Sequence, residues 1–375
     1  MPSRRVLILY ASAGMGHYRV AQALEEALHF LSGDVEVHVS DALDYTNPIF
    51  KNLYGGGYIG IVKNSPELWG YLYNKCNDVS FSRKSEKLRG ILAKANSPEF
   101  LSHVLEHDPH VIVCTHFFPV GLLSPQKKRG RLTSSIQCII TDFALHSFWV
   151  RSPVDKYFVP TEESKRSLVR RGQSAESVHV LGIPVARRFA EPSVPREERE
   201  RLGLEPTADT ILVLSGGFGV GPVAAIVKSF EGAGEGLQLV VICGKNLALQ
   251  RRLAALRDDR SIPMHVHGWV DNVAEFMGAA DVVITKPGGS TISEILAKNV
   301  PMVIVDPIPG QEQRNCEYLL EEGAAIRLHD MQEAAYCIRK LLSDKEKLVA
   351  MRANVARIAR PNAARDIARV VLSSI

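Results

Sequence analysis

Several features that place a chain in a specialised class are scarce or missing from this sequence. Its six cysteines include no CxxC pair and no Cys/His metal spacing, so neither a disulfide framework nor a zinc module is expected. No run of about 18 apolar residues is present, which argues against a membrane-spanning helix. The net charge of +4 is too small for a dedicated nucleic-acid-binding protein, so nucleic acid is not an expected partner.

A targeting signal is also missing from the first residues. The apolar run Val6–Tyr10 is too short for the core of a signal peptide and leads directly into a glycine loop. Scattered cysteines without pairing motifs are typical of thiols in a reducing cytosol. Together these features predict a cytoplasmic protein.

What the sequence does contain is a repeated α/β pattern. Hydrophobic residues make up 46% and charged residues 23% of the 375 residues, which is typical of a soluble globular protein with room for two domains. Strand-like runs alternate with helical periodicity, and the pattern starts twice, at Arg5–Tyr10 and at Ile211–Leu214, each time before a glycine loop. This predicts the α/β class, with two doubly wound parallel-sheet domains facing a cleft.

The boundary between the two domains is predicted near residue 187. The stretch Ala190–Arg201 carries proline and many charges, so residues 188–208 are predicted to be a linker. This leaves an N-terminal domain over residues 1–187 and a C-terminal domain over residues 209–358. Residues 359–375 are predicted to form a helix that packs back toward the N-terminal domain.

Residues 45–90 interrupt the α/β pattern. They hold eight of the 26 aromatic residues, and seven Lys/Arg against three acidic residues. Aromatic side chains interleaved with cations suit a segment that lies among lipid headgroups, which makes an anionic membrane surface an expected partner. The alternative is an ordinary helical excursion that packs on its own domain and carries solvated lysines.

The two glycine loops suit phosphate groups. Gly14-Met-Gly-His17 would need glycine in place of Arg19 to match GxGxxG, although Asp41, after the second strand, leaves an NAD site as an alternative. Ser215–Gly221 places glycines after a strand and before a helix, where their amides can hold a pyrophosphate. It lacks the GK[ST] of a P-loop, which argues against an NTPase.

A third loop of this kind is KPGGSTISE, residues 286–294. Its glycines stand between an apolar run and a helix, which is typical of an anionic ligand held on a helix N-terminus. Glu294 has two interpretations. It forms a capping box with Thr291, or it points into the cleft and contacts the ligand. We expect the second.

Three titratable side chains are candidates for catalysis. His17 stands at a helix start, where the positive end of the helix dipole keeps the imidazole neutral and able to accept a proton. Asp142 and His146 follow the strand Ile136–Ile140, so they are expected at the same cleft and suit general-base work or acceptor binding. The alternative for each is a structural role in a turn or cap.

Eight short motifs occur along the chain: Gly14-Met-Gly-His17, Thr141-Asp-Phe-x-x-His146, Gly182-Ile-Pro184, Gly216-Gly-Phe-Gly219, Cys243-Gly-Lys-Asn246, Gly268-Trp-Val270, Lys286-Pro-Gly-Gly289 and Pro309-Gly-Gln-Glu312. In this order they resemble those of the GT-B glycosyltransferases that make glycolipids, namely the monogalactosyldiacylglycerol synthases and the processive diacylglycerol glucosyltransferases. The resemblance covers nearly the whole chain. More distantly, the chain is similar to the N-acetylglucosaminyltransferase that completes lipid II.

The resemblance implies a GT-B fold that inverts the anomeric carbon and uses no metal or other cofactor. The donor would be UDP-glucose or UDP-galactose, held mainly by the C-terminal domain. The implied donor residues are Gly217, Phe218, Gly219, Gly288, Gly289, Ser290 and Thr291 at the diphosphate, Lys245 and Asn246 along the nucleotide, Trp269 and Val270 at the uracil, Glu294 at the ribose, and Gln311 and Glu312 at the sugar.

On the acceptor side, the resemblance implies diacylglycerol bound by the N-terminal domain, with His17 or Asp142 as the general base. The protein would attach peripherally to the inner face of the cell membrane. The residues implied in the acceptor and membrane-facing region are Gly16, Tyr54, Tyr58, Trp69 and Tyr71.

Two positions depart from the family pattern. Trp269 stands where Phe is more usual, and Arg314 replaces a smaller residue, which leaves the donor-sugar preference open. The alternatives to a diacylglycerol glycosyltransferase are a UDP-GlcNAc transferase that acts on an undecaprenyl-linked acceptor, a nucleotide-sugar epimerase, and a nucleotide-sugar sensor without turnover. The aromatic and basic segment 45–90 disfavours the epimerase. Glucose versus galactose, the number of sugars added and the oligomeric state stay open.

Overall fold

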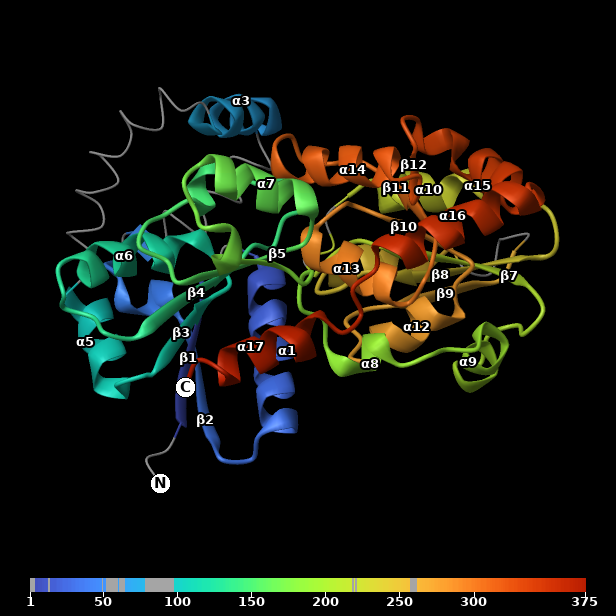
Figure 1. Ribbon diagram of the computed structural model, residues 1–375. Helices are drawn as coiled ribbons and strands as arrows, with labels where there is room; N and C mark the ends of the chain where they lie inside the picture. The colour runs from blue at the N-terminus through green and yellow to red at the C-terminus, as the bar shows by residue number, and fades with distance from the viewer. Residues whose placement is uncertain are drawn as a thin grey trace. The chain divides into compact units, whose positions relative to one another are not determined.

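The computed structural model describes residues 4–12, 14–48, 50–51, 60, 65–77, 98–217, 219, 221–256 and 262–375. The chain forms two compact units. Unit 1 comprises Met1–Arg187, Ile308–Arg314 and Asn362–Ile375, and unit 2 comprises Arg188–Pro307 and Asn315–Pro361. Within the described residues, each unit has one parallel sheet of six strands with helices on both faces (Figure 1). The predicted α/β class with two doubly wound domains is confirmed.

The sheet of unit 1 has the strand order β2-β1-β3-β4-β5-β6, with all neighbours parallel. Its interior strands are runs of Val, Ile and Leu buried on both faces, as expected for a parallel sheet covered by helices. The order reverses between β1 and β3, which makes their carboxyl ends the switch point of this unit. The strands are β1 (Arg4–Tyr10), β2 (Val35–Asp41), β3 (Val111–Cys114), β4 (Ser135–Ile139), β5 (Lys156–Val159) and β6 (Val178–Val180).

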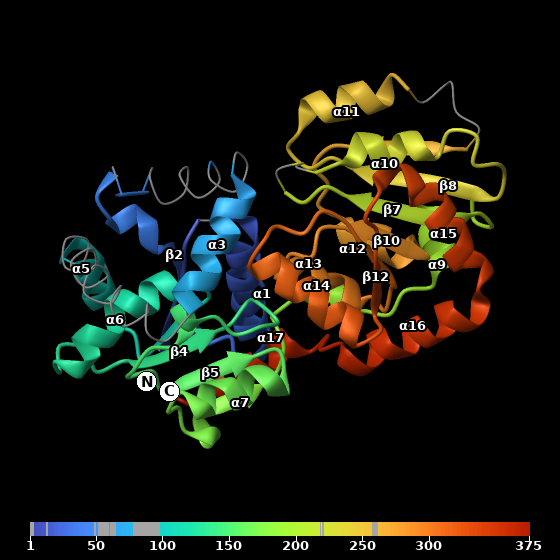
Figure 2. The same ribbon diagram turned by 90° about the horizontal axis from the view of Figure 1, so that it is seen from above.

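Helices cover this sheet on the two sides that right-handed crossovers require. Helices α1 and α17 lie on one face and α5 and α6 on the other (Figures 1 and 2). The helices of unit 1 are α1 (Met15–Leu31), η1 (Ala42–Tyr45), α3 (Pro66–Asn77), α5 (Pro98–His107), α6 (Phe117–Lys128), η2 (Ser147–Trp149), α7 (Glu162–Arg170), η3 (Ala175–Ser177) and α17 (Ala363–Leu372).

The C-terminal helix α17 belongs to unit 1. It packs along α1, and its side chains Ile367 and Val371 are fully buried. The hydroxyl of Ser374 accepts hydrogen bonds from Gln137 Nε2 at 3.0 Å and from Lys156 Nζ at 2.8 Å. The end of the chain is therefore tied to strands β4 and β5.

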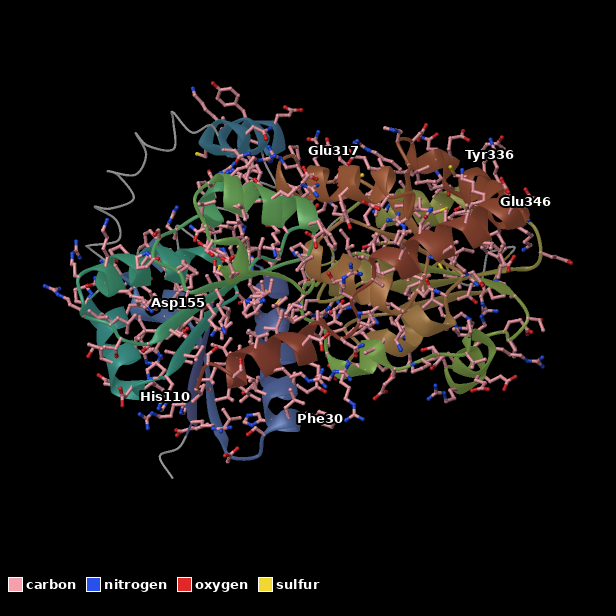
Figure 3. All side chains as sticks on the ribbon, in the orientation of Figure 1. Phe30, His110, Asp155, Glu317, Tyr336 and Glu346 are labelled. Carbon is pink, nitrogen blue, oxygen red and sulfur yellow. The ribbon has the colours of Figure 1, made fainter. Side chains whose placement is uncertain are left out.

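Two labelled side chains in Figure 3, Asp155 and Phe30, illustrate contacts at the surface of unit 1. Asp155 joins β4 to α6, because its Oδ2 accepts from Ile136 N at 2.6 Å and pairs with Lys127 Nζ at 2.5 Å. Phe30, near the end of α1, is 62% exposed, and the Arg187 guanidinium lies 4.6 Å from the centre of its ring. A single exposed aromatic of this kind is common on soluble proteins.

The sheet of unit 2 has the strand order β12-β11-β10-β7-β8-β9, again fully parallel. The order reverses between β7 and β10, so the loops that follow these two strands lie side by side. Both loops are glycine-rich. The strands are β7 (Asp209–Leu214), β8 (Leu237–Ile242), β9 (Met264–His267), β10 (Val282–Thr285), β11 (Met302–Ile304) and β12 (Ala325–Arg327).

The sheet of unit 2 is also covered on both faces. Helices α10 and α11 lie on one face and α12 and α13 on the other (Figure 2). The helices that follow unit 1 along the chain are α8 (Arg187–Ala190), α9 (Pro195–Arg201), α10 (Val223–Ser229), α11 (Leu247–Ala254), α12 (Val273–Ala279), α13 (Gly289–Ala297), α14 (Gln311–Glu321), η4 (Met331–Glu333), α15 (Ala334–Ser343) and α16 (Lys345–Ile358).

Residues 188–208, for which the composition predicts a linker, fold instead as part of unit 2. Helix α9 packs against α12, and Arg199 is buried between them. Its Nε donates to the Ala279 carbonyl at 2.9 Å, and its Nη2 pairs with Asp281 Oδ2 at 2.5 Å. The charged composition of this stretch therefore includes a buried ion pair with a distant residue.

Among the described helices, none is both long enough and apolar enough to cross a bilayer. All six cysteines are among the described residues and are free thiols. Cys114, Cys138, Cys243 and Cys316 are buried, where a thiol behaves as a small apolar side chain.

The packing of α17 leads to a stability prediction. Ile367→Ala removes a fully buried side chain and is expected to lower the free energy of unfolding by about 2–4 kcal/mol. Arg369→Ala, on the exposed side of the same helix, is the matched control and should cost at most about 0.5 kcal/mol. Urea unfolding of both variants measures this. Equal effects would show that α17 does not contribute to the core.

Candidate functional site

One catalytic candidate of unit 1, His17, lies where the strand order of this unit reverses. His17 lies in the first turn of α1, directly after the partly buried Gly16, and Thr115 follows β3, the neighbour of β1. His17 Nδ1 is 2.8 Å from the Thr115 carbonyl oxygen and 3.2 Å from the hydroxyl of Thr141, which follows β4. The Thr115 hydroxyl also donates to the His17 carbonyl at 3.0 Å. Three strand ends thus hold one imidazole.

These contacts define the tautomer of His17. A carbonyl oxygen only accepts, so Nδ1 carries the ring proton and Nε2 keeps its lone pair. Burial lowers the pKa of His17 to about 4, against the smaller opposing effect of the bond to Thr115. The ring of His116 packs edge-on at 4.5 Å, and burial holds its pKa well below the ordinary value. At neutral pH His17 is therefore an uncharged proton acceptor.

The other two catalytic candidates have different surroundings. Asp142 is partly buried after β4, in the same loop as Thr141. His146 is 1% exposed, and both of its ring nitrogens have partners within the protein. Its Nδ1 accepts from Phe148 N at 3.2 Å, which caps η2, and its Nε2 donates to the Tyr73 carbonyl at 2.9 Å. This geometry favours the structural alternative for His146 and leaves Asp142 as the second candidate base.

Sequence reasoning missed the two residues that surround His17 most closely. Thr115 and His116 follow β3, which pairs with β1. Their position at the carboxyl end of that strand is the feature that could have indicated them. Asp41, which left an NAD site open as an alternative, is 8% exposed and bonds to the protein backbone. Its Oδ1 accepts from Ser12 N at 3.2 Å and from Leu43 N at 3.0 Å. Asp41 shapes the glycine loop and caps η1.

The glycine loop after β7 in unit 2 is locked against the loop after β8. Gly219 has a φ of +66°, and a Cβ there would lie 2.3 Å from the Asn246 Cβ. Gly244 has a φ of +58°, and its Cβ would lie 2.6 Å from the Gly216 carbonyl oxygen. Only glycine fits such contacts at these two positions. Gly217 is partly buried in this loop, and Phe218 lies outside the described residues.

The nucleotide candidates Lys245 and Asn246 make different contacts. The Asn246 side chain is used within the protein, because Oδ1 accepts from Leu249 N and Nδ2 donates to the Gly219 carbonyl, both at 2.9 Å. Lys245 is exposed, with its Nζ 5.3 Å from the centre of the Trp269 ring. Trp269 is 42% exposed and is followed by the partly buried Val270. Lys245 and Trp269 thus form a cation–π pair on the surface of unit 2.

The loop after β10 leads into α13. Its N-cap is Gly288, which has no side chain to accept from the first-turn amides. Gly289, Ser290 and Thr291 form that first turn and are partly buried. Such a turn offers oriented N–H groups and the positive end of a helix dipole to an anion.

Glu294 lies further inside α13 and is 4% exposed. Because the helix begins at Gly289, Thr291 is not its N-cap, and no side chain caps the helix. The capping-box interpretation of Thr291 and Glu294 is therefore wrong. The ligand interpretation of Glu294 stays a prediction.

Lys286 adds a cation to this switch point, and it was not among the predicted ligands. Its Nζ pairs with Asp306 Oδ2 at 2.7 Å, and its Cε lies 3.3 Å from where a Cβ of Gly221 would be. The side chain therefore runs from the end of β10 toward the glycine loop after β7. The sequence feature that could have indicated Lys286 is its position directly after a strand and before a glycine pair.

The sugar candidates Gln311 and Glu312 lie at the start of α14. Glu312 accepts from Ile308 N at 2.9 Å, which closes the turn before the helix. Gln311 Oε1 accepts from the indole N–H of Trp69 at 3.2 Å. Tyr71, on the same helix as Trp69, is 60% exposed. The acceptor candidates Tyr54 and Tyr58 lie outside the described residues.

Comparison with known proteins shows which families match the two units. Residues 17–185 match the monogalactosyldiacylglycerol (MGDG) synthase family, and residues 210–370 match the glycosyltransferase family 28 C-terminal domain. The chain is 32% identical over 360 residues to the processive diacylglycerol beta-glucosyltransferase of Bacillus subtilis (strain 168), which covers 94% of this chain and 91% of that protein.

Two solved structures share the fold at low sequence identity. MurG of Acinetobacter baumannii has a TM-score of 0.62 and 14% identity over 99% of each chain. The UDP-GlcNAc 2-epimerase of Neisseria meningitidis, bound to UDP-GlcNAc, has a TM-score of 0.59 and 12% identity over 98% of this chain and 100% of that one. Transferases and epimerases thus share this architecture, so the fold alone does not define the reaction.

The two parallel-sheet units have the GT-B fold, and the family matches make the chain a glycosyltransferase. The chain belongs to the family of diacylglycerol glycosyltransferases that contains the MGDG synthases and the processive diacylglycerol beta-glucosyltransferases. The family resemblance stated from the sequence motifs is confirmed.

The placement of Glu294 leads to a binding prediction. If its carboxylate accepts from ribose hydroxyls, Glu294→Gln should weaken UDP binding roughly 10-fold, the usual size of a charged hydrogen bond. Ser293→Ala, one residue earlier in the same helix, is the matched control and should bind UDP normally. Calorimetric titration with UDP measures both. Unchanged UDP affinity together with a lower melting temperature would assign Glu294 a purely structural role.

The lowered pKa of His17 leads to a prediction for acid stability. With a pKa of about 4 in the folded chain and about 6.5 in the unfolded chain, only the unfolded chain binds this proton at pH 5. Folding stability from this group is therefore complete above pH 6.5 and falls as the pH drops toward 4. Between pH 7.5 and 5, the wild type should lose about 2 kcal/mol more than His17→Gln.

Denaturant unfolding at the two pH values tests this, with His29→Gln as the control because His29 is exposed on the same helix. The control should lose stability as the wild type does. Equal losses in the wild type and in His17→Gln would contradict a neutral, partly buried His17 with a lowered pKa.

Proposed function

We propose that this protein transfers glucose or galactose from a UDP-sugar to diacylglycerol at a membrane surface, forming a glycolipid with inversion at the anomeric carbon. The observation that carries the proposal is the near full-length match to a processive diacylglycerol beta-glucosyltransferase. The two switch points supply what the reaction needs: a proton acceptor in unit 1 and a set of anion-binding amides in unit 2.

The donor diphosphate is assigned to the switch point of unit 2. The first turn of α13 and the glycine loop after β7 offer oriented amides, and Lys286 adds a positive charge. These groups stabilise the negative charge that develops on the leaving UDP. Glu294 takes the ribose hydroxyls, and Trp269 with Val270 takes the uracil.

His17 is assigned as the general base. The acceptor hydroxyl oxygen attacks the anomeric carbon, the bond from that carbon to the diphosphate oxygen breaks, and its electron pair leaves with UDP. The hydroxyl proton goes to His17 Nε2, whose lone pair is kept available by the proton on Nδ1. Attack from the side opposite the leaving group inverts the configuration.

No metal ion is needed in this proposal. Helix-start amides and the ammonium group of Lys286 supply the stabilisation that a divalent cation supplies in other transferases. Activity in the presence of a chelator is therefore expected.

The acceptor is assigned to unit 1 together with the membrane surface. Helix α3 exposes Leu68 and Tyr71, at 52% and 60%, and the Lys75 ammonium bonds to the Tyr71 hydroxyl at 3.0 Å. Apolar and aromatic groups beside a cation suit the headgroup region of a bilayer, where the hydroxyl of diacylglycerol lies. The protein would act as a peripheral enzyme on the inner face of the cell membrane.

A product assay tests the proposal. Purified protein, diacylglycerol vesicles and labelled UDP-glucose or UDP-galactose should give a labelled, β-linked glycolipid, with or without EDTA. His17→Gln should lower turnover roughly 100-fold or more, the usual contribution of a general base, whereas His29→Gln should be fully active. Separation of the lipids and NMR of the product measure these outcomes.

Three other outcomes would contradict parts of the proposal. Full activity of His17→Gln would remove His17 as the base. Conversion of the UDP-sugar without any lipid would indicate the epimerase reaction that proteins of this fold also catalyse. Transfer only to an undecaprenyl-linked acceptor would assign the protein to the transferases of the lipid II type.

A further inference from the structure

A chain of aromatic rings runs through unit 1 from the candidate base to helix α3. The centres of the His17 and His116 rings are 4.5 Å apart, and the Phe117 ring lies 4.1 Å from that of His116. The Phe148 ring lies 5.1 Å from that of Phe117 and 6.5 Å from that of Tyr73, on α3. All these residues belong to unit 1. We call His116, Phe117, Phe148 and Tyr73 the aromatic band.

Two histidine caps position the phenylalanines of the aromatic band. His116 caps α6, because its Nδ1 accepts from Phe118 N at 3.0 Å, and Phe117 is the first residue of that helix. His146 caps η2 in the same way, since its Nδ1 accepts from Phe148 N at 3.2 Å. Helix η2 contacts both α6 and α3. The structural role of His146 is therefore to hold Phe148 where these helices meet.

Phe117 and Phe148 are both only partly buried. The Phe117 ring packs at a steep angle on that of Trp149, with 5.6 Å between their centres, and borders the core of unit 1. Trp149 itself is 1% exposed, so this contact joins the band to the interior. The remaining surface of the two phenylalanine rings is apolar and lies in the same ring cluster as the candidate base.

At its far end the aromatic band reaches a helix that exposes apolar groups. Tyr73 is 6% exposed, and its carbonyl accepts from His146 Nε2 at 2.9 Å, which ties α3 to the loop after β4. The same helix exposes Leu68 and Tyr71, at 52% and 60%. The helix assigned to the membrane surface and the rings beside His17 are therefore parts of one packed group within unit 1.

A lipid acceptor needs apolar contact close to the base. The reactive hydroxyl of diacylglycerol is attached to a glycerol that carries ester-linked acyl chains. When this hydroxyl approaches His17 Nε2, the first carbons of a chain leave the bilayer, which costs free energy unless they contact another apolar surface. The aromatic band offers such a surface next to His17.

We propose that Phe117 and Phe148 bind the apolar part of the acceptor beside His17, in contact with the glycerol-proximal carbons of an acyl chain. This inference rests on the proposed function, in that it takes diacylglycerol as the acceptor and His17 as the base. It adds an acyl subsite within unit 1 that is separate from the membrane contact assigned to α3. Chain length then influences the reaction even where no bilayer is present.

Water-soluble acceptors test this without a bilayer. The wild type should use dihexanoylglycerol with a higher kcat/KM than diacetylglycerol, because the longer chains cover more of the two rings. Phe117→Ser and Phe148→Ser should each lower kcat/KM for dihexanoylglycerol roughly 4- to 15-fold, the worth of one to two methylene groups in apolar contact. The value for diacetylglycerol should change less than about two-fold, because its chains make little of this contact. The KM for the UDP-sugar should stay unchanged.

Two further variants separate apolar contact from folding. Phe117→Leu keeps an apolar side chain and should retain the preference for dihexanoylglycerol. Phe30→Ser is the matched control, because it removes an aromatic ring that is 62% exposed at the end of α1, and it should behave as the wild type does. Melting temperatures of all variants show whether the fold is kept.

Three outcomes would overturn the inference. Equal losses for the two acceptors in Phe117→Ser would indicate damage to the base, and unchanged values in both serine variants would show that no chain contacts the rings. A Phe117→Leu variant as impaired as Phe117→Ser would show that apolar character is not what the position supplies.

Failure of the proposed function is read separately, in the wild type. A wild type that transfers sugar to neither acylglycerol nor to diacylglycerol vesicles would contradict the proposed function, and the acyl subsite with it. A wild type that transfers sugar, with a chain-length preference that both serine variants keep, would contradict the acyl subsite alone.

Discussion

Three strand ends of unit 1 converge on His17, and the shortest contact is the 2.8 Å bond from its Nδ1 to the Thr115 carbonyl. This bond exists because β1 and β3 are neighbours at a reversal of strand order, which brings residues nearly a hundred positions apart into contact. It places the ring proton on Nδ1, and burial keeps the ring uncharged. The proposed chemistry depends on this. An imidazole with protons on both nitrogens, or with its one proton on Nε2, would have no lone pair on Nε2 for the acceptor hydroxyl.

In the proposed reaction, unit 2 would stabilise the charge of the leaving diphosphate, at a reversal of strand order like that of unit 1. The neighbours β7 and β10 bring a glycine loop beside a helix N-terminus that has no side-chain cap. Glycines 219 and 244 lock the loop because neither position has space for a Cβ. Backbone amides that are already oriented need little reorganisation when charge develops, and this is what the proposed reaction requires of unit 2.

Much of this architecture could be predicted from the sequence, because strands, glycine loops and their order are local patterns. What the sequence could not indicate is the partners of particular side chains, because these partners lie far along the chain. Arg199 looked like part of a charged linker, since its partner Asp281 is visible only in the fold. The engaged ring of His146 depends on the Tyr73 carbonyl, more than 70 residues earlier. The start of α13 at Gly289, which excludes the capping-box alternative for Thr291, is also not marked by the periodicity of the sequence.

The central claim, that His17 is a neutral base with a free lone pair on Nε2, is most directly tested by NMR of the histidine ring nitrogens. With ¹⁵N-labelled histidine, and His17→Gln to assign the signal, the account predicts the Nδ1–H tautomer at pH 7. It also predicts that no imidazolium forms until the pH falls well below 6.5. An Nε2–H tautomer, or a protonated ring at pH 7, would contradict it.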